Sequence, residues 1–576
     1  MQQAVGSRLP SGEFFRYNRR FVKRIAALSV LLVSVLAAAG RQPERARRAM
    51  VVSREDHASM AGVRTLEQGG NAVDAAVAVG LALAVTHPSA GNLGGGGFML
   101  IRWADGRSTF LDFRERAPEK ATRDMYLNAA GSLTQDSVVG YRAVGVPGTV
   151  RGLEYAWRKY GRRPWTELVA PARELAATGF PVSYGLARSL RSTKALARFP
   201  ESRRIFQRDG QFFEPGEKLI QPELAATLGR IAKHGSRDFY QGETARLLVQ
   251  DMQRNGGFIT QRDLHEYEVK ERTPLRGAYR GYELLTAPPP SSGGAGILQM
   301  LNVLDGTAYE QAGAGSAASI HLVAEAMRRF FADRAQHFGD ADFAKVPVSG
   351  LISRPYAEQL RRGIRADRAT PSSQVRAGSV SSLESLETTH YSIVDAEGAA
   401  VAVTYTLNGG YGSGVAPAGL GFLLNNEMDD FTAKPGAPNA YGLLQAEANA
   451  IEPRKRPLSS MTPTIVTRDG QFFLAVGSPG GPTIISTVLL VLLNVIDFGM
   501  DIQQAVDWPR FHHQWMPDEL RLEESGFSPD TIALLESRGH QVRRRGYQGE
   551  VCAIQRKDGW LLGAPDSRTE ATARGF

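Results

Sequence analysis

The sequence predicts an α/β fold of the mixed α+β kind, in which antiparallel strands lie stacked between layers of helices. Residues 71–88 have an apolar helical pattern on nearly every side, which indicates a helix buried between two layers. Residues 120–365 are mostly helical in pattern, whereas the hydrophobic period changes to that of strands after residue 387. A four-layer helix–sheet–sheet–helix sandwich (αββα) accommodates these features.

Local signals define the elements in the first half of the chain. A helix over residues 58–68 ends at a Gly-Gly pair, and Asn71 is placed to cap the next helix. A glycine turn leads into a strand over residues 91–103, and a second strand follows over 108–118. Residues 316–339 have the clear amphipathic pattern of a helix.

Hairpins dominate the pattern of the second half. Ala-Glu-Gly joins residues 388–395 to 399–407, and Asp-Gly joins two strands within 463–481. Residues 419–426 are predicted to form a further strand. Apolar helices begin near Ile484, and two short strands close the chain.

Composition and charge set broad limits on the class of protein. The 576 residues are 43% hydrophobic and 22% charged, which is ordinary globular usage with enough apolar material for a large core. The formal net charge is +9, but residues 1–50 hold ten Lys or Arg against two Glu and so carry +8 of it. Because the rest is nearly neutral, we expect no nucleic-acid partner.

The N-terminus has the features of an export signal. A basic stretch precedes an apolar run from Ile25 to Ala39, which is shorter than the ~20 residues that a membrane span needs. We therefore expect residues 1–39 to be a signal peptide and the protein to be periplasmic or extracellular, without a stable membrane span after cleavage. An uncleaved anchor is the alternative. Cys552 is the single cysteine, which excludes an internal disulfide, and its strand-like surroundings indicate packing.

A polar, Ser-rich loop over residues 366–387 ends abruptly at Thr388, where a strand begins. A threonine hydroxyl is a weak nucleophile and needs an adjacent base. If the chain were cut between Glu387 and Thr388, the new α-amine, with an ordinary pKa near ~8, would supply that base. A threonine that merely favours a strand is the simpler interpretation of Thr388 by itself.

Other stretches add groups that this chemistry needs. Residues 477–481 (GSPGG) lie between an apolar strand and a helix, where backbone N–H groups can stabilise an oxyanion. Glu427 and Asp430 follow a predicted strand and can bind an ammonium group, with a Ca²⁺ site as the alternative. Arg114 can hold a carboxylate in a fork. The paired hydroxyls of Ser459 and Ser460 complete a set that suits an α-amino acid head group beside a reactive carbonyl.

Seven motifs together resemble the γ-glutamyltransferase (glutathione hydrolase) family, within the N-terminal nucleophile hydrolases. In chain order they are GGNAVDAA, DFRERAP, TTHYSIVD, TYTLNGGYGSG, LLNNEMDDF, RPLSSMTPTIV and GSPGG, and the match runs from about residue 48 to the C-terminus. The resemblance implies an αββα sandwich without a cofactor or a metal. It also implies self-cleavage into a large subunit, residues 40–387, and a small subunit, residues 388–576.

The resemblance also implies a role for each site residue. Thr388 would be the nucleophile, first on the Glu387 carbonyl and later on the substrate, and Thr406 would hydrogen-bond to it. The N–H groups of Gly480 and Gly481 would hold the oxyanion. The remaining implied roles are binding of the α-carboxylate by Arg114, Ser459 and Ser460, binding of the α-amino group by Asn408, Glu427 and Asp430, and closure of the pocket by Tyr441.

The implied activity is cleavage of γ-glutamyl amides such as glutathione, with transfer to water or to amino acid and peptide acceptors. One alternative is a related acylase acting on glutaryl or cephalosporin side chains, although the ammonium ligands argue against it because a glutaryl group has no amine. A non-processed exported binding protein is the other. Pro482-Thr483 stands where some family members have Ser-Arg, which leaves the acceptor side open.

Overall fold

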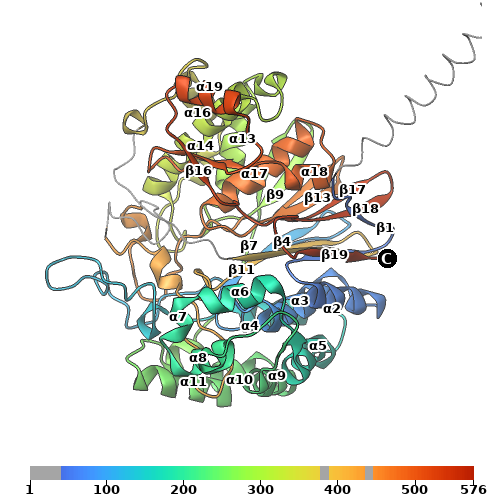
Figure 1. Cartoon of the computed structure of the whole chain (residues 1–576), viewed down its shortest axis with the longest axis vertical. Coiled ribbons are helices and arrows are strands. Elements are labelled where there is room, and N and C mark those ends of the chain that lie inside the picture. Colours follow the sequence, from blue (N-terminus) through green and yellow to red (C-terminus); the bar gives the residue numbers. More distant parts are fainter. Residues whose placement is uncertain (1–39, 376–387, 435–444) are drawn as a thin grey trace, which may run out of the picture. The chain divides into compact units, whose positions relative to one another are not determined.

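Two seven-stranded sheets form the centre of the structure, a computed structural model that describes residues 40–375, 388–434 and 445–576 (Figure 1). Residues from Pro43 to Phe576 form one compact unit, and both sheets belong to it. The predicted signal peptide, residues 1–39, lies outside the described residues.

The first sheet carries the strand that follows Thr388. Every neighbouring pair in it is antiparallel. Its strand order is β19 (Thr572–Gly575), β2 (Met50–Ser53), β10 (Thr389–Val394), β11 (Ala400–Thr406), β3 (Gly96–Arg102), β4 (Ser108–Asp112) and β7 (Lys270–Arg272).

The second sheet is also antiparallel throughout. Its inner face shares one core with the first sheet, where Leu100 and Ala402 pack with Leu474 and Ile554. Its strand order is β1 (Glu44–Ala46), β18 (Trp560–Pro565), β17 (Cys552–Lys557), β13 (Gln471–Gly477), β12 (Thr464–Arg468), β9 (Tyr282–Thr286) and β8 (Leu275–Tyr279).

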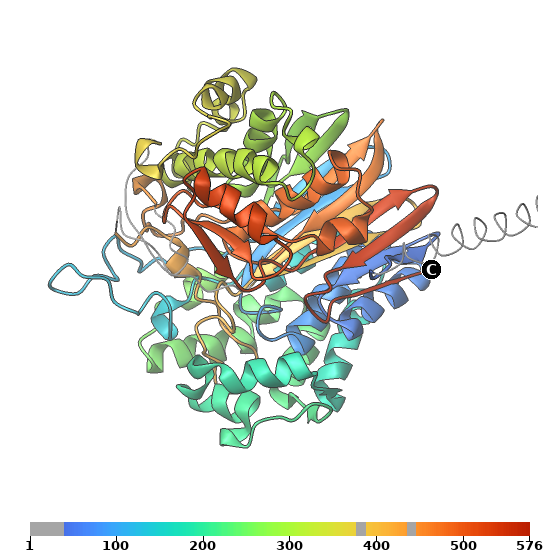
Figure 2. The same cartoon turned by 45° about the horizontal axis from the view of Figure 1, so that its top comes forward.

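Helices cover the outer face of each sheet, so the predicted four-layer sandwich is confirmed (Figures 1 and 2). The first sheet is covered mainly by α2 (Asp56–Glu67), α3 (Ala72–Thr86), α4 (Thr149–Tyr160) and α5 (Trp165–Thr178), with α6 (Tyr184–Ser192), α7 (Lys194–Ala197), α8 (Pro200–Gln207), α9 (Pro222–His234), α10 (Ser236–Gln241), α11 (Glu243–Arg254) and α12 (Gln261–His265) beyond them. The second is covered by α13 (Gly293–Leu304), α14 (Ala317–His337), α15 (Val348–Leu351), α16 (Arg354–Arg362), α17 (Thr483–Ile496), α18 (Ile502–Asp507) and α19 (Pro529–Ser537).

Local chemistry explains why α3, which packs against β10, forms where it does. Asn71 caps α3, as predicted, and its side chain accepts hydrogen bonds from the N–H groups of Val73 and Asp74, each at 3.0 Å. Asp74 in turn accepts from the Asn71 N–H at 3.0 Å, which completes a capping box. All fifteen residues of α3 are buried, in agreement with its apolar pattern on all sides.

Within the described ranges, no helix has both the length and the apolar character that a bilayer span requires.

The two hairpins predicted around Gly398 and around Asp469-Gly470 are both confirmed. β10 pairs with β11 through the turn that contains Gly398, whose φ is +87°. β12 pairs with β13 through Asp469 and Gly470, which both adopt positive φ as a tight hairpin turn requires. Cys552 is buried in β17, as expected for a packing residue, and burial raises the pKa of its thiol.

The prediction of a strand over residues 419–426 was wrong. Only Leu424 makes an isolated bridge, to Gly94, and Gly419 and Gly421 both have a φ of +76°, which breaks an extended ladder. The amide side chain of Asn425 instead donates to the carbonyls of Gly94 and Gly145, each at 2.8 Å. This stretch is therefore irregular backbone held by side-chain hydrogen bonds.

Several smaller elements were not predicted. Strands β8 and β9 lie within the region that was expected to be mostly helical. The chain closes with three strands of the main sheets rather than two, and a small sheet of β14 (Phe511–His512), β15 (Leu520–Glu523) and β16 (Val542–Arg545) precedes them. The remaining pair is β5 (Phe180–Pro181) with β6 (Lys218–Leu219).

We predict that Gly477→Ala destabilises the protein by about 1–3 kcal/mol, because overpacking of a core costs that much. A Cβ at Gly477 would lie 2.3 Å from two ring atoms of His390, and that ring is held by Thr404 Oγ1 at 2.8 Å and Ser392 Oγ at 3.0 Å. Urea unfolding followed by circular dichroism measures the change. Gly350→Ala is the control, because it meets nothing within 4 Å. Equal unfolding midpoints for the two variants would contradict the prediction.

Candidate active site

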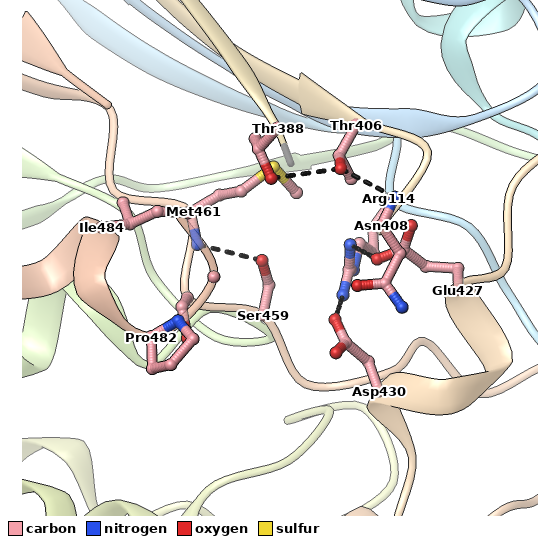
Figure 3. A pocket seen from close by; sticks show the side chains of 12 residues that line it. Arg114, Thr388, Thr406, Asn408, Glu427, Asp430, Ser459, Met461, Pro482 and Ile484 are labelled. Atoms are coloured by element: carbon pink, nitrogen blue, oxygen red, sulfur yellow. Dashed lines mark hydrogen bonds and ion pairs between the residues drawn. The ribbon is translucent and has the colours of Figure 1, made fainter. Parts of the chain in front are cut away.

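Thr388 lies directly before β10, beside the end of β11 (Figure 3). The two strands are in register with Thr389 opposite Tyr405, so that Thr388 and Thr406 lie across from each other. Their hydroxyl oxygens are 3.2 Å apart, and the Asn408 N–H donates to Thr406 Oγ1 at 2.8 Å. Thr388 is only 7% exposed. A buried hydroxyl pair of this kind restricts the Thr388 oxygen to a narrow range of orientations.

Arg114 follows β4 and is the central cation of the site. Its guanidinium donates to Glu427 and, at 2.5 Å, to Asp430 Oδ2. It also donates to the backbone carbonyls of Pro457 at 3.3 Å and Leu458 at 3.1 Å. The side chain is 1% exposed, so these partners replace water and fix the guanidinium in one position.

The acidic residues around Arg114 come from a short 3₁₀ turn, Glu427–Asp430. The Asn425 side chain orients this turn by accepting the Glu427 N–H at 3.0 Å. Asp429 points elsewhere and accepts from Ser137 Oγ at 2.9 Å. In the part of the chain that the structure describes, no three His, Cys, Asp or Glu side chains are grouped as metal ligands would be.

Glu115 is a third carboxylate beside Arg114, and the sequence analysis did not predict it as a site residue. It is fully buried, with Oε2 3.7 Å from Arg114 Nη1. Burial raises the pKa of Glu115 to about 7, against the opposing effect of the Arg114 charge. Burial likewise raises the pKa of Glu427 above its ordinary range. Its position next to Arg114 in DFRERAP was the only available signal.

Ser459 and Ser460 line the same cavity as the acidic turn (Figure 3 shows Ser459). Ser459 Oγ accepts the Met461 N–H at 3.1 Å, and Ser460 Oγ accepts from Arg334 at 3.2 Å. Arg334, on α14, is a second buried guanidinium that the sequence did not reveal, and burial lowers its pKa to about 10. An amphipathic helical pattern does not distinguish a buried arginine from an exposed one.

Gly480 and Gly481 form the turn between β13 and α17. Their φ values are +129° and +53°, which side chains of L-residues rarely adopt. A Cβ on Gly480 would also lie 2.4 Å from Thr483 Oγ1. Glycine is therefore required here for the backbone to turn beside Thr388.

One cavity of about 300 Å³ brings most of the predicted site residues together (Figure 3). Its lining residues from the predicted set are Arg114, Thr388, Thr406, Asn408, Glu427, Asp430, Ser459, Ser460 and Gly481. Gly480 instead lines a second cavity, which also reaches Thr388. Glu387 and Tyr441 lie outside the described residues, so their predicted roles stay predictions.

Two stacked antiparallel sheets between helical layers, with a buried threonine at the start of a central strand, define the fold of the N-terminal nucleophile hydrolases. A family model described as Gamma-glutamyltranspeptidase matches residues 58–576, and the chain belongs to this family.

Three similar proteins illustrate the relationship. The Glutathione hydrolase proenzyme of Escherichia coli (strain K12) is 48% identical over 568 residues, which cover 95% of this chain and 98% of that protein. The crystal structure of cephalosporin acylase from Bacillus halodurans matches with a TM-score of 0.82 at 27% identity and covers 93% of this chain and 97% of that one. Helicobacter pylori gamma-glutamyltranspeptidase matches with a TM-score of 0.55 at 45% identity, over 56% of this chain and 94% of that one.

We predict that Glu115→Gln changes how stability depends on pH. Because the folded pKa of about 7 exceeds the ordinary 4.5, the native state holds a proton between these pH values that the unfolded state lacks. The resulting stabilisation is complete below pH 4.5 and is lost as the pH rises through about 7. Wild type should therefore lose on the order of 1–3 kcal/mol relative to Glu115→Gln between these limits.

Urea unfolding at several pH values tests this change in stability. Glu67→Gln, at an exposed helix end, is the control and should follow the wild-type pH dependence. Parallel curves for wild type and Glu115→Gln would show that Glu115 does not retain a proton in the folded state.

Proposed function

We propose that this chain is a self-processing γ-glutamyltransferase and glutathione hydrolase. It cleaves γ-glutamyl amides and passes the γ-glutamyl group to water or to an amino acid or peptide acceptor. The observation that carries this proposal is a single cavity lined by Thr388 together with Arg114, Glu427 and Asp430. Family membership and the 48% identity to a glutathione hydrolase proenzyme support it.

Self-processing would create the catalyst. Thr388 Oγ attacks the Glu387 carbonyl, the peptide C–N bond breaks, and an ester links the two parts of the chain. Water hydrolyses this ester, which leaves a carboxylate on Glu387 and a free α-amine on Thr388. The products are a large subunit, residues 40–387, and a small subunit, residues 388–576. The Thr406 hydroxyl, 3.2 Å from Thr388 Oγ1, is positioned to orient the attacking oxygen in this step.

In turnover, the Thr388 α-amine accepts the proton of Thr388 Oγ, which attacks the γ-carbonyl of the substrate. The N–H groups of Gly480 and Gly481 stabilise the oxyanion. When the amide C–N bond breaks, the proton passes to the leaving amine and a γ-glutamyl ester remains on Thr388. Water or an acceptor amine then attacks the ester and regenerates the hydroxyl.

Recognition would rely on exchange of partners inside the charged cluster. Arg114, with Ser459 and Ser460, binds the α-carboxylate, and Asn408, Glu427 and Asp430 bind the α-ammonium. Arg114 already contacts Glu427 and Asp430 in the structure. A zwitterionic head group adds one charge of each sign, so it can enter this cluster without changing the net charge. Tyr441 would close the pocket over the substrate.

We place the enzyme in the periplasm or outside the cell. The basic stretch and apolar run within residues 1–39 support export. No cofactor takes part in the proposed reaction, since nucleophile, base and oxyanion donors all come from the chain itself.

Thr388→Ala should abolish self-cleavage and γ-glutamyl transfer together, because it removes the nucleophile for both reactions. Thr388→Ser should retain both at a reduced rate, since it keeps a hydroxyl. Thr406→Ala should slow both about tenfold, as expected for loss of one hydrogen bond. Intact mass and N-terminal sequencing detect a fragment that begins at residue 388. A single uncut, inactive wild-type chain would refute the proposal and favour a binding protein.

The TM-score of 0.82 to a cephalosporin acylase supports the acylase alternative. We predict that glutaryl anilide is cleaved at least about 100-fold less efficiently than γ-glutamyl anilide. A glutaryl group brings a carboxylate without an ammonium, so it adds uncompensated negative charge beside Glu115, Glu427 and Asp430. The ratio of kcat/KM for the two substrates measures the preference. Comparable values would overturn the γ-glutamyl assignment in favour of an acylase.

A further inference from the structure

Thr388 lies at the junction of two cavities. The smaller one, of about 300 Å³, holds the Arg114 cluster and is lined by Gly481. The larger one, with about 1630 Å³ of empty space, lies against Thr388 and Gly480. Because the reacting carbonyl must sit within reach of both the Thr388 hydroxyl and the glycine turn, a bound substrate places its scissile bond at this junction.

This placement divides the substrate into two halves. The head group with its α-carboxylate and α-ammonium fits the small charged cavity, which leaves the larger cavity for the atoms beyond the scissile nitrogen. The larger cavity is polar along much of its length, with eight serine and threonine residues in its lining. It suits a flexible, hydrogen-bonding chain such as a short peptide.

Most charged groups that line the larger cavity already have hydrogen-bond or ion-pair partners. Arg54 binds Glu550 at 2.6 Å, and Arg568 binds Glu523 at 2.9 Å. Glu570 accepts from Ser183 Oγ at 2.5 Å and from the Gly185 N–H at 3.2 Å. Glu55 accepts from the N–H of Ala58 at 3.1 Å and lies 2.6 Å from His57.

Arg188 differs from the other arginines of this cavity. It is exposed on α6, and its side chain makes no hydrogen bond or ion pair with any described residue. Its helix is connected to the active site, because the Tyr411 hydroxyl donates to Ser189 Oγ at 2.8 Å. Tyr411 belongs to the loop that follows β11 and Asn408, so the position of α6 is coupled to the strand that carries Thr406.

We propose that the larger cavity binds the leaving peptide and that Arg188 binds the C-terminal carboxylate of that peptide. This inference rests on the proposed function and extends it to the other half of the substrate. An acceptor peptide attacks the ester from the position that the leaving peptide vacates, so Arg188 should also favour acceptors with a free carboxylate. Its guanidinium supplies a charge-assisted, bidentate contact in a cavity that is otherwise close to neutral.

The test compares three γ-glutamyl substrates on the processed enzyme. Glutathione has a leaving peptide with a free carboxylate, its glycinamide analogue lacks only that charge, and γ-glutamyl anilide has no peptide at all. Arg188→Ala should lower kcat/KM for glutathione about fivefold, mainly through KM, which is typical for loss of a partly exposed ion pair. Values for the other two substrates should stay within about twofold.

Matched variants separate binding from general effects. Arg191→Ala removes another exposed arginine of α6, one that pairs with Glu214 and does not line the cavity, and it should leave all three substrates unchanged. Arg188→Lys should restore only part of the lost affinity for glutathione, because an ammonium keeps the charge but cannot make the bidentate contact. An equal loss for glutathione and its amide, or no loss for either, would overturn the role of Arg188. Failure of the wild-type enzyme to cleave even the anilide would instead refute the proposed function.

Discussion

The antiparallel pairing of β10 with β11 is the contact on which the site depends. It places the Thr388 hydroxyl 3.2 Å from that of Thr406, on the side of the sheet end that faces the cavity. A shift of register by one residue would turn the hydroxyl to the opposite face. Burial on both faces prevents such a shift, because every residue of both strands is packed. The packing that stabilises the core therefore also fixes the orientation of Thr388.

The second sheet positions the glycine turn at Gly480 and Gly481 relative to Thr388. His390 projects from β10 against Gly477 at the end of β13, where no side chain could fit. Burial lowers the pKa of His390 to about 3, so the ring is a neutral spacer whose two nitrogens are hydrogen-bonded to Thr404 and Ser392. The turn at Gly480 follows three residues later. Close packing between the sheets thus fixes the position of the glycine turn, the proposed oxyanion donor, relative to the Thr388 hydroxyl.

Charge compensation governs the rest of the site. Glu115, Glu427 and Asp430 surround one guanidinium, and burial raises the pKa of both glutamates. Such a cluster favours a ligand that carries charges of both signs, since either sign alone would be uncompensated at low dielectric. On the other side of Thr388, the larger cavity has mostly paired charges and one arginine without a partner among the described residues. The two cavities therefore differ in the kind of substrate group that they can stabilise.

The sequence by itself determined the local features: the helix cap at Asn71, the two hairpins, the glycine turn at Gly480 and Gly481, and the order of the family motifs. These depend on residues close together in the chain, where hydrogen bonds and allowed φ values act directly. Only the tertiary structure decided the long-range partners. Arg114 meets Glu427 across 313 residues, and the burial of Glu115 and Arg334 depends on which layers cover them. Burial and charge pairing are properties of the packed chain, so no local pattern could reveal them. For the same reason, the sequence did not show that residues 419–426 are held by side-chain hydrogen bonds and form no strand.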